Sequence, residues 1–123
     1  MCIRDRRKHA GMIVPAPVQA AMVAALGDDA HVAEVKHRYA ARRGALHGAL
    51  VAAGMTVNDS QAGLYLWATR GDDCWDTVNE LAGLGILVAP GIFYGAAGRS
   101  HVRVALTATD ERVSQAVSRL GSC

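Results

Sequence analysis

An arginine stands in the middle of a predicted β-strand, HVRVAL, at residues 101–106. Val102, Val104 and Leu106 are apolar at alternate positions, which is typical of a strand with one face on a core. Arg103 therefore lies on the opposite face, which meets either solvent or an anion. A guanidinium is a planar fork of N–H groups that matches a carboxylate through two parallel hydrogen bonds. A rigid strand is a suitable mount for such a group.

Residue types that support metal binding or nucleophilic catalysis are not arranged in recognisable motifs. Cys2, Cys74 and Cys123 are widely spaced and form no C-x-x-C pair, so neither a zinc site nor a disulfide framework is expected. No two of the five histidines are four residues apart, which argues against a metal site on a helix. The chain also lacks the common nucleotide-binding and serine-hydrolase motifs. We expect no catalytic residue and no metal in this chain.

The three scattered cysteines favour a reducing cytoplasm, and neither a nucleic-acid nor a membrane partner is expected. Of the 123 residues, 51% are apolar and 20% charged, which is enough apolar material for a core. The net charge of +2 is too small to indicate nucleic-acid binding, and the basic run at 36–43 is interpreted as a solvated helix face. Pro15, Pro17 and Gln19 interrupt the apolar run near the N-terminus, so it is not interpreted as a signal peptide.

Proline, glycine and capping residues predict four helices. They are expected at about 17–26, at 29–53, at 74–84 and after Thr109. Apolar residues at helical spacing predict which side chains are buried. In the long second helix these are Val32, Val35, Tyr39, Leu46 and Leu50, and in the third they are Trp75, Val78 and Leu81 or Ala82.

Four short strands are expected, at 55–59, 63–68, 86–89 and 101–106. In the second, Leu64 and Leu66 share one face while Tyr65 and Trp67 share the other. The run ILVA at 86–89 is apolar throughout, which favours a buried strand.

The order of elements, two helices followed by β-β-α-β-β-α, predicts an α+β fold. We expect a two-layer sandwich in which helices cover one face of a small, mostly antiparallel sheet, preceded by the long helix. Tyr65, Trp67 and Arg103 are expected together on the other face.

Three segments carry a resemblance to a known family: GLYLW at 63–67, ILVAPGIFYG at 86–95 and HVRVALTATDERVSQAV at 101–117. Together they resemble the C-terminal small domain of class I/II aminotransferases, the fold-type I enzymes that use pyridoxal phosphate. The family has an aromatic-rich strand after a glycine, a strand ending in P-G-x-x-F-G, and a strand R-[IVL]-[SA]-[FL].

The match to these motifs is made residue by residue. Pro90, Gly91 and Gly95 agree with the P-G-x-x-F-G motif, and Tyr94 stands where the family often has phenylalanine. By this resemblance Arg103 is the arginine that binds the substrate α-carboxylate. Tyr94 and Gly63 are the further substrate-binding candidates that the resemblance implies.

The resemblance covers residues 7–120 and implies a division of the chain. Residues 1–6 resemble a translated sequencing adapter and are interpreted as a non-native leader. Residues 7–29 would be the tail of a large cofactor-binding domain, and residues 30–123 the small domain with its long interdomain helix. Within the family, the sequence is most similar to succinyldiaminopimelate transaminases of lysine biosynthesis. This implies a homodimer that transfers an amino group between glutamate and a keto acid, N-succinyl-2-amino-6-ketopimelate.

The family chemistry needs a lysine that bonds covalently to pyridoxal 5'-phosphate. The chain has only Lys8, in the basic N-terminal segment, and Lys36, among other charges. The resemblance places the reactive lysine and the cofactor-binding residues upstream. We therefore expect a truncated enzyme that is inactive alone and keeps the carboxylate half of its site. The alternative that the sequence leaves open is a free-standing α+β ligand-binding or regulatory module.

Overall fold

The structure is a computed structural model that describes residues 2–122, so Met1 and Cys123 lie outside the described residues. Its contacts divide the chain into two compact units, Met1–Val35 and Lys36–Cys123. The division falls inside the long helix rather than at its start, where the sequence places the domain boundary. The assignment of 7–29 and 30–123 to two domains stays a prediction.

The first unit contains α1 (Ile3–His9), α2 (Ala16–Leu26) and the first turns of α3 (Asp29–Ala52). Helix α2 begins after Pro15 and ends at Gly27, as the sequence predicts. Asp28 Oδ1 accepts a hydrogen bond from the His31 backbone N–H at 2.9 Å, which caps the start of α3. Neither α1 nor α2 contains a buried residue.

The second unit is built on a four-stranded antiparallel sheet with the order β1-β2-β4-β3. The strands are β1 (Thr56–Asn58), β2 (Tyr65–Thr69), β3 (Ala89–Pro90) and β4 (His101–Ala105). The central pair, β2 and β4, has the register that places Trp67 directly opposite Arg103.

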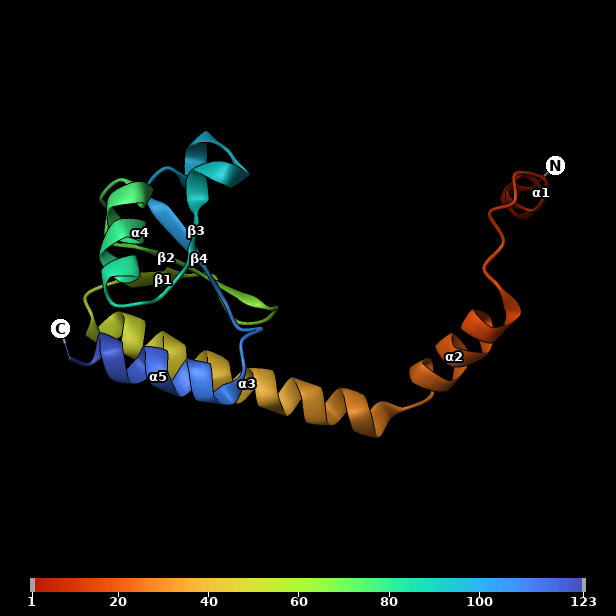
Figure 1. Ribbon diagram of the computed structural model, residues 1–123, viewed down its shortest axis with the longest axis horizontal. Coiled ribbons are helices and arrows are strands. Elements are labelled where there is room, and N and C mark those ends of the chain that lie inside the picture. Colours follow the sequence, from red (N-terminus) through yellow and green to blue (C-terminus); the bar gives the residue numbers. More distant parts are fainter. Residues whose placement is uncertain (1, 123) are drawn as a thin grey trace. The chain divides into compact units, whose positions relative to one another are not determined.

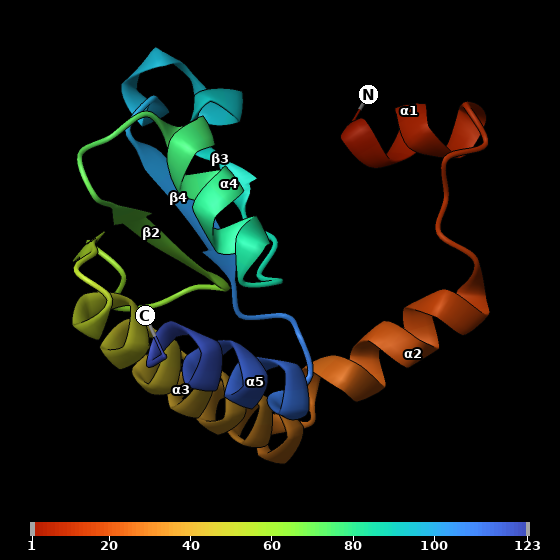
Figure 2. The same cartoon turned by 60° about the vertical axis from the view of Figure 1, so that its left-hand side comes forward.

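Helices cover one face of this sheet, so the predicted two-layer α+β sandwich is confirmed. Helix α5 (Asp110–Leu120) lies beside the C-terminal half of α3, and α4 (Cys74–Gly83) packs near β3 and β4 (Figures 1 and 2). The core is one cluster in which Leu66, Ala68, Val102 and Val104 of the sheet meet Leu46, Leu50, Leu81 and Leu120 of the helices. Each of these sheet residues is at most 6% exposed.

Two helix faces differ from the prediction. On α3, Val32 is 57% exposed and Val35 is half-buried, because the core cluster reaches this helix only from Tyr39 onward. On α4, Trp75 is 48% exposed and Ala82 is exposed as well. The buried positions of α4 are Cys74, Thr77 and Leu81, and Val78 packs against the core, so the predicted burial is confirmed for Leu81 and in part for Val78.

The expected buried strand at 86–89 is wrong in extent and in burial. Only Ala89 and Pro90 pair with β4, and Leu87 is 88% exposed. The segment is the outer edge of the sheet, and Pro90 has no N–H with which to continue the ladder. Leu64 also differs from the prediction: it precedes β2 and is 43% exposed. No helix in the described part of the chain is long and apolar enough to cross a membrane.

Candidate functional site

The sheet face opposite the helices carries the residues that can bind a ligand. It is lined from β2 by Tyr65, Trp67 and Thr69, and from β4 by His101, Arg103 and Ala105. These are the alternate positions to the buried ones, so the predicted grouping of Tyr65, Trp67 and Arg103 on one face is confirmed.

The guanidinium of Arg103 lies between two tyrosine rings. Its Cζ atom is 4.2 Å from the ring centre of Tyr65 and 5.0 Å from that of Tyr94. Tyr65 is its diagonal neighbour on β2, and Tyr94 comes from η1 (Gly91–Tyr94), a short 3-10 helix after β3. Contacts with aromatic faces at this range are favourable for a cation. They hold the guanidinium in place while leaving its N–H edge for another group.

The Nε–H group of Arg103 is buried and has no hydrogen-bond partner among the described residues. Two other arginines also have an unpaired Nε, but the guanidinium of each is bonded elsewhere. Arg43 donates through Nη2 to the Gly63 carbonyl, and Arg70 forms an ion pair with Glu80. Arg103 has no carboxylate partner in the described chain. A buried donor left unpaired costs about 1–3 kcal/mol, so this group is suited to an acceptor supplied from outside.

The loop that delivers Tyr94 is fixed by a close approach of two glycines. A Cβ atom at Gly91 would clash with the Gly98 carbonyl, and would lie 2.5 Å from the His101 carbonyl and 2.9 Å from Trp67 Cη2. Gly95 has φ of 118°, which favours glycine. The P-G-x-x-Y-G segment therefore needs its glycines to bring Tyr94 against the sheet.

A second aromatic group borders Arg103. Trp67 contacts Tyr94 edge-on with ring centres 5.9 Å apart, and it stacks on His101 at 5.3 Å with an angle of 10° between the rings. Ser100 Oγ lies 3.2 Å from His101 Nδ1. Tyr65, Trp67 and His101 were not among the site candidates. The alternation of β2 and β4 is the signal that could have added them.

The structure brings two of the three predicted site residues together. Arg103 and Tyr94 are in contact, whereas the contact of Gly63 is with α3. Gly63 precedes β2, has φ of 85°, and offers its carbonyl to Arg43. Its conformation explains why glycine is needed at this position. A role for Gly63 in substrate binding stays a prediction.

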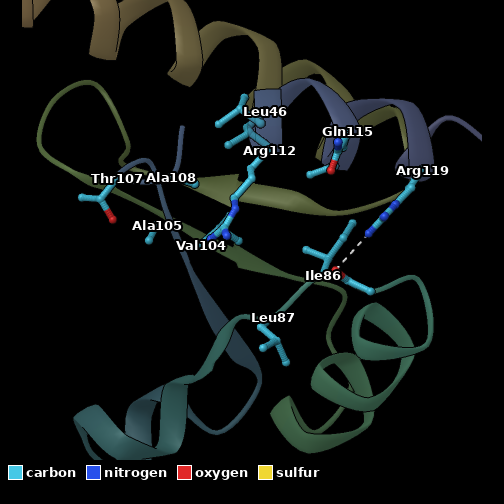
Figure 3. A pocket seen from close by; sticks show the side chains of 13 residues that line it. Leu46, Ile86, Leu87, Val104, Ala105, Thr107, Ala108, Arg112, Gln115 and Arg119 are labelled. Atoms are coloured by element: carbon cyan, nitrogen blue, oxygen red, sulfur yellow. Dashed lines mark hydrogen bonds between the residues drawn. The ribbon is translucent and has the colours of Figure 1, made fainter. Parts of the chain in front are cut away.

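A separate hollow of about 580 Å³ lies on the helix side of the sheet (Figure 3). Arg112, Gln115 and Arg119 line it from α5, opposite Ile86 and Leu87. Arg119 Nη1 donates to the carbonyls of Leu84 (3.2 Å) and Gly85 (3.1 Å), so this arginine closes the C-terminal end of α4. Because the hollow does not include Arg103, it is not part of the candidate carboxylate site.

In comparisons with known proteins, one family matches nearly the whole chain. The profile of one family, aminotransferase class I and II, matches residues 5–120. A protein of Mycobacterium tuberculosis named as a probable aminotransferase is 68% identical over 114 residues, which are 93% of this chain and 27% of the relative. The 4-dedimethylamino-4-oxo-anhydrotetracycline transaminase OxyQ of Streptomyces rimosus is 64% identical over 114 residues, 93% of this chain and 32% of the relative.

A solved structure supports the same comparison. The N-succinyldiaminopimelate aminotransferase from Mycobacterium tuberculosis matches with a TM-score of 0.77 and 26% identity, covering 97% of this chain and 33% of that protein. The chain thus spans about a quarter to a third of the length of these relatives.

Proposed function

The chain belongs to the aminotransferase class I and II family, and we propose that it is the substrate-carboxylate-binding part of a pyridoxal-phosphate-dependent aminotransferase. Members of this family use pyridoxal phosphate, which supplies the electron sink for amino transfer when bound. We assign residues 7–29 to the tail of the large domain and 30–123 to the small domain, in a cytoplasmic homodimer.

The unpaired, tyrosine-flanked guanidinium of Arg103 is the observation that carries this proposal. A substrate carboxylate supplies the acceptor that Arg103 lacks, and the fork of N–H groups sets the orientation of that carboxylate. The amino donor and the keto acid both carry an α-carboxylate, so one arginine serves both halves of the reaction. Tyr94 and Tyr65 keep the fork in position through their ring contacts with the guanidinium.

The residues of this chain do not fit the cofactor itself. Lys8 and Lys36 are both exposed, whereas a lysine that bonds to the cofactor needs a desolvated pocket to be nucleophilic at neutral pH. We therefore assign pyridoxal phosphate to the upstream part of the parent protein. This chain binds and orients the substrate.

For the substrates, we propose glutamate as donor and N-succinyl-2-amino-6-ketopimelate as acceptor, in lysine biosynthesis. The name of the N-succinyldiaminopimelate aminotransferase with the same fold supports this acceptor. The name of the relative OxyQ refers to an oxo-anhydrotetracycline, so a polycyclic ketone is the substrate to test against this acceptor. Both acceptors can be offered to the same full-length enzyme, and a preference for the polycyclic ketone would exclude the lysine pathway.

The test of the site uses a full-length chimera, in which residues 7–120 replace the matching part of the 68%-identical relative. Arg103→Ala should lower kcat/KM for both glutamate and the keto acid by about 30-fold to several-thousand-fold, the range for removing one partner of a desolvated charge pair. Arg103→Lys should lose less, because it keeps the charge without the fork.

The matched control is Arg112→Ala, which changes an exposed arginine on α5. We expect its kcat/KM to stay within about twofold of the parent, as for surface substitutions in general. If Arg103→Ala behaves like this control for donor and acceptor alike, Arg103 is a surface residue and the assignment is wrong.

A further inference from the structure

We propose that His101 is a positioning residue for the substrate carboxylate, because its ring holds Trp67 away from Arg103. The inference rests on the proposed role of Arg103 in carboxylate binding. His101 and Arg103 are alternate residues of β4 and therefore share a face of the sheet. Neither the motifs nor the similarity to other proteins assigns a role to His101.

Trp67 and Arg103 are directly opposite each other on this face, but the ring contact of each is with another residue. The register places Trp67 opposite Arg103, yet each makes its ring contact with a diagonal neighbour. The guanidinium lies over Tyr65, 4.2 Å from its ring centre, and the indole stacks on His101 at 5.3 Å. Diagonal neighbours on a sheet are within reach of aromatic and long side chains. The two diagonals run in the same sense, so the two contacts do not interfere.

The indole of Trp67 approaches the backbone at Gly91 and contacts two rings, those of His101 and Tyr94. Its Cη2 atom is so close to Gly91 that a Cβ atom there would be at 2.9 Å. The His101 ring is nearly parallel to the indole, with 10° between the planes, and Ser100 Oγ lies beside its Nδ1 atom. Because Gly91 has no side chain, the imidazole is the stacking partner that orients the indole plane.

Without the imidazole, the indole can turn towards the guanidinium directly opposite. An indole is the aromatic ring that attracts a guanidinium most strongly, so this contact would be favourable in itself. It would compete with Tyr94, which now touches both side chains, at 5.9 Å from Trp67 and 5.0 Å from Arg103. The N–H fork would then move from the position in which it donates hydrogen bonds to a substrate carboxylate.

The first experiment observes Trp67 in the 123-residue chain. Trp75→Phe leaves Trp67 as the single tryptophan, because the chain has two. His101→Ala should then shift the emission of Trp67 and raise its quenching by acrylamide, whereas His101→Phe should keep the parent spectrum because it keeps the ring. His47→Ala, which changes an exposed histidine on α3, is the matched control. An unchanged spectrum in His101→Ala would overturn the proposal.

The second experiment measures kinetics in the full-length chimera. His101→Ala should raise KM for glutamate and for the keto acid about 2- to 10-fold, which corresponds to the loss of one aromatic pair. Its kcat should change less than about twofold, and His101→Phe should restore KM. Equal losses in His101→Ala and His101→Phe would instead assign a direct contact through the imidazole nitrogens and overturn the positioning role.

Arg103→Ala in the same chimera separates failure of this inference from failure of the proposed function. If Arg103→Ala impairs both half-reactions while His101→Ala is indistinguishable from the parent, the carboxylate site stands and the positioning role falls. If Arg103→Ala has no effect, the proposed function falls, whatever the result for His101.

Discussion

Arginine side chains in this chain serve two different purposes that their partners distinguish. Arg42, Arg43 and Arg70 donate to carboxylates or backbone carbonyls of the same unit, so their charges are satisfied within the fold. The guanidinium of Arg103 lies over two tyrosine rings, and its buried Nε–H group has no acceptor among the described residues. The difference matters because an internal partner would have to be displaced before a ligand could bind, whereas the proposed binding of a substrate carboxylate by Arg103 needs no such displacement.

The close approach of Gly91 to Gly98 gives a prediction for stability. Gly91→Ala places a Cβ against the Gly98 carbonyl, and we expect the free energy of unfolding to fall by about 1–3 kcal/mol or more, as for overpacking. Gly44→Ala on α3 is the matched control, because nothing lies within 4 Å of its Cβ position. That change should raise stability by about 0.5–1 kcal/mol through helix propensity. Urea denaturation followed by circular dichroism measures both, and equal stabilities would contradict the steric argument.

At the scale of elements, two consecutive arginines of α3 hold one end of the sheet. Arg42 Nη1 donates to the Leu106 carbonyl just after β4, at 3.1 Å, and Arg43 donates to the Gly63 carbonyl just before β2. Interpreting the basic run at 36–43 as a solvated face is therefore wrong for Arg42, whose side chain is only 13% exposed. These two arginine contacts connect the long helix to β4, which carries Arg103, and to β2, which carries Tyr65.

Arg42 also contacts α5, and this contact predicts that the stability of the fold depends on pH. Arg42 Nε donates to Asp110 Oδ1 at 2.5 Å, and this hydrogen bond lowers the pKa of the Asp110 carboxyl below its usual value of 3.8. A lowered folded-state pKa stabilises the fold above pH 3.8, and this contribution is lost as the pH falls through the folded-state value. Asp110→Asn should therefore flatten the fall in stability below pH 3.8.

Unfolding curves measured in steps of pH from neutral to acid check this expectation. Asp59→Asn, which removes one carboxylate in the turn after β1, is the matched control, because asparagine tolerates the positive φ of 41° at that position. If both variants keep the acid sensitivity of the parent, the Arg42–Asp110 contact contributes nothing to it.

Elements whose own residues show a clear pattern could be predicted from the sequence. Elements whose burial depends on where they lie in the tertiary fold could not. Strands β2 and β4 alternate strictly, so their buried and open faces followed from the sequence. The run at 86–89 has no alternation, and its position at the sheet edge is a property of the tertiary fold. In the site, Arg103 and Tyr94 followed from family motifs. The stack of His101 on Trp67 depends on strand register and diagonal contacts, which the sequence does not specify.

At the scale of the molecule, the two units differ in how they are stabilised. The second unit has a continuous core to which α3, α4, α5 and the sheet all contribute. In the first, α1 and α2 have no buried residue, and Val23 and Leu26 are 74% and 80% exposed. The assignment of residues 7–29 to a large domain stays a prediction, and the matched segment is only 32% of the length of the relative OxyQ.

Hydrogen exchange tests this contrast with two helices of equal length. Helices α2 and α5 each have 11 residues, but α5 buries Val113 and Leu120 whereas α2 buries none. Isolated helices shorter than about 12–15 residues are marginal in water, so amides at 17–26 should exchange much faster than those of α5 and β4. Mass-spectrometric exchange of the 123-residue chain should be run over a dilution series, because self-association through the apolar side chains of α2 would protect it at high concentration. Protection of α2 equal to that of α5 in the dilute monomer would show that α2 is stabilised without its expected large-domain partner.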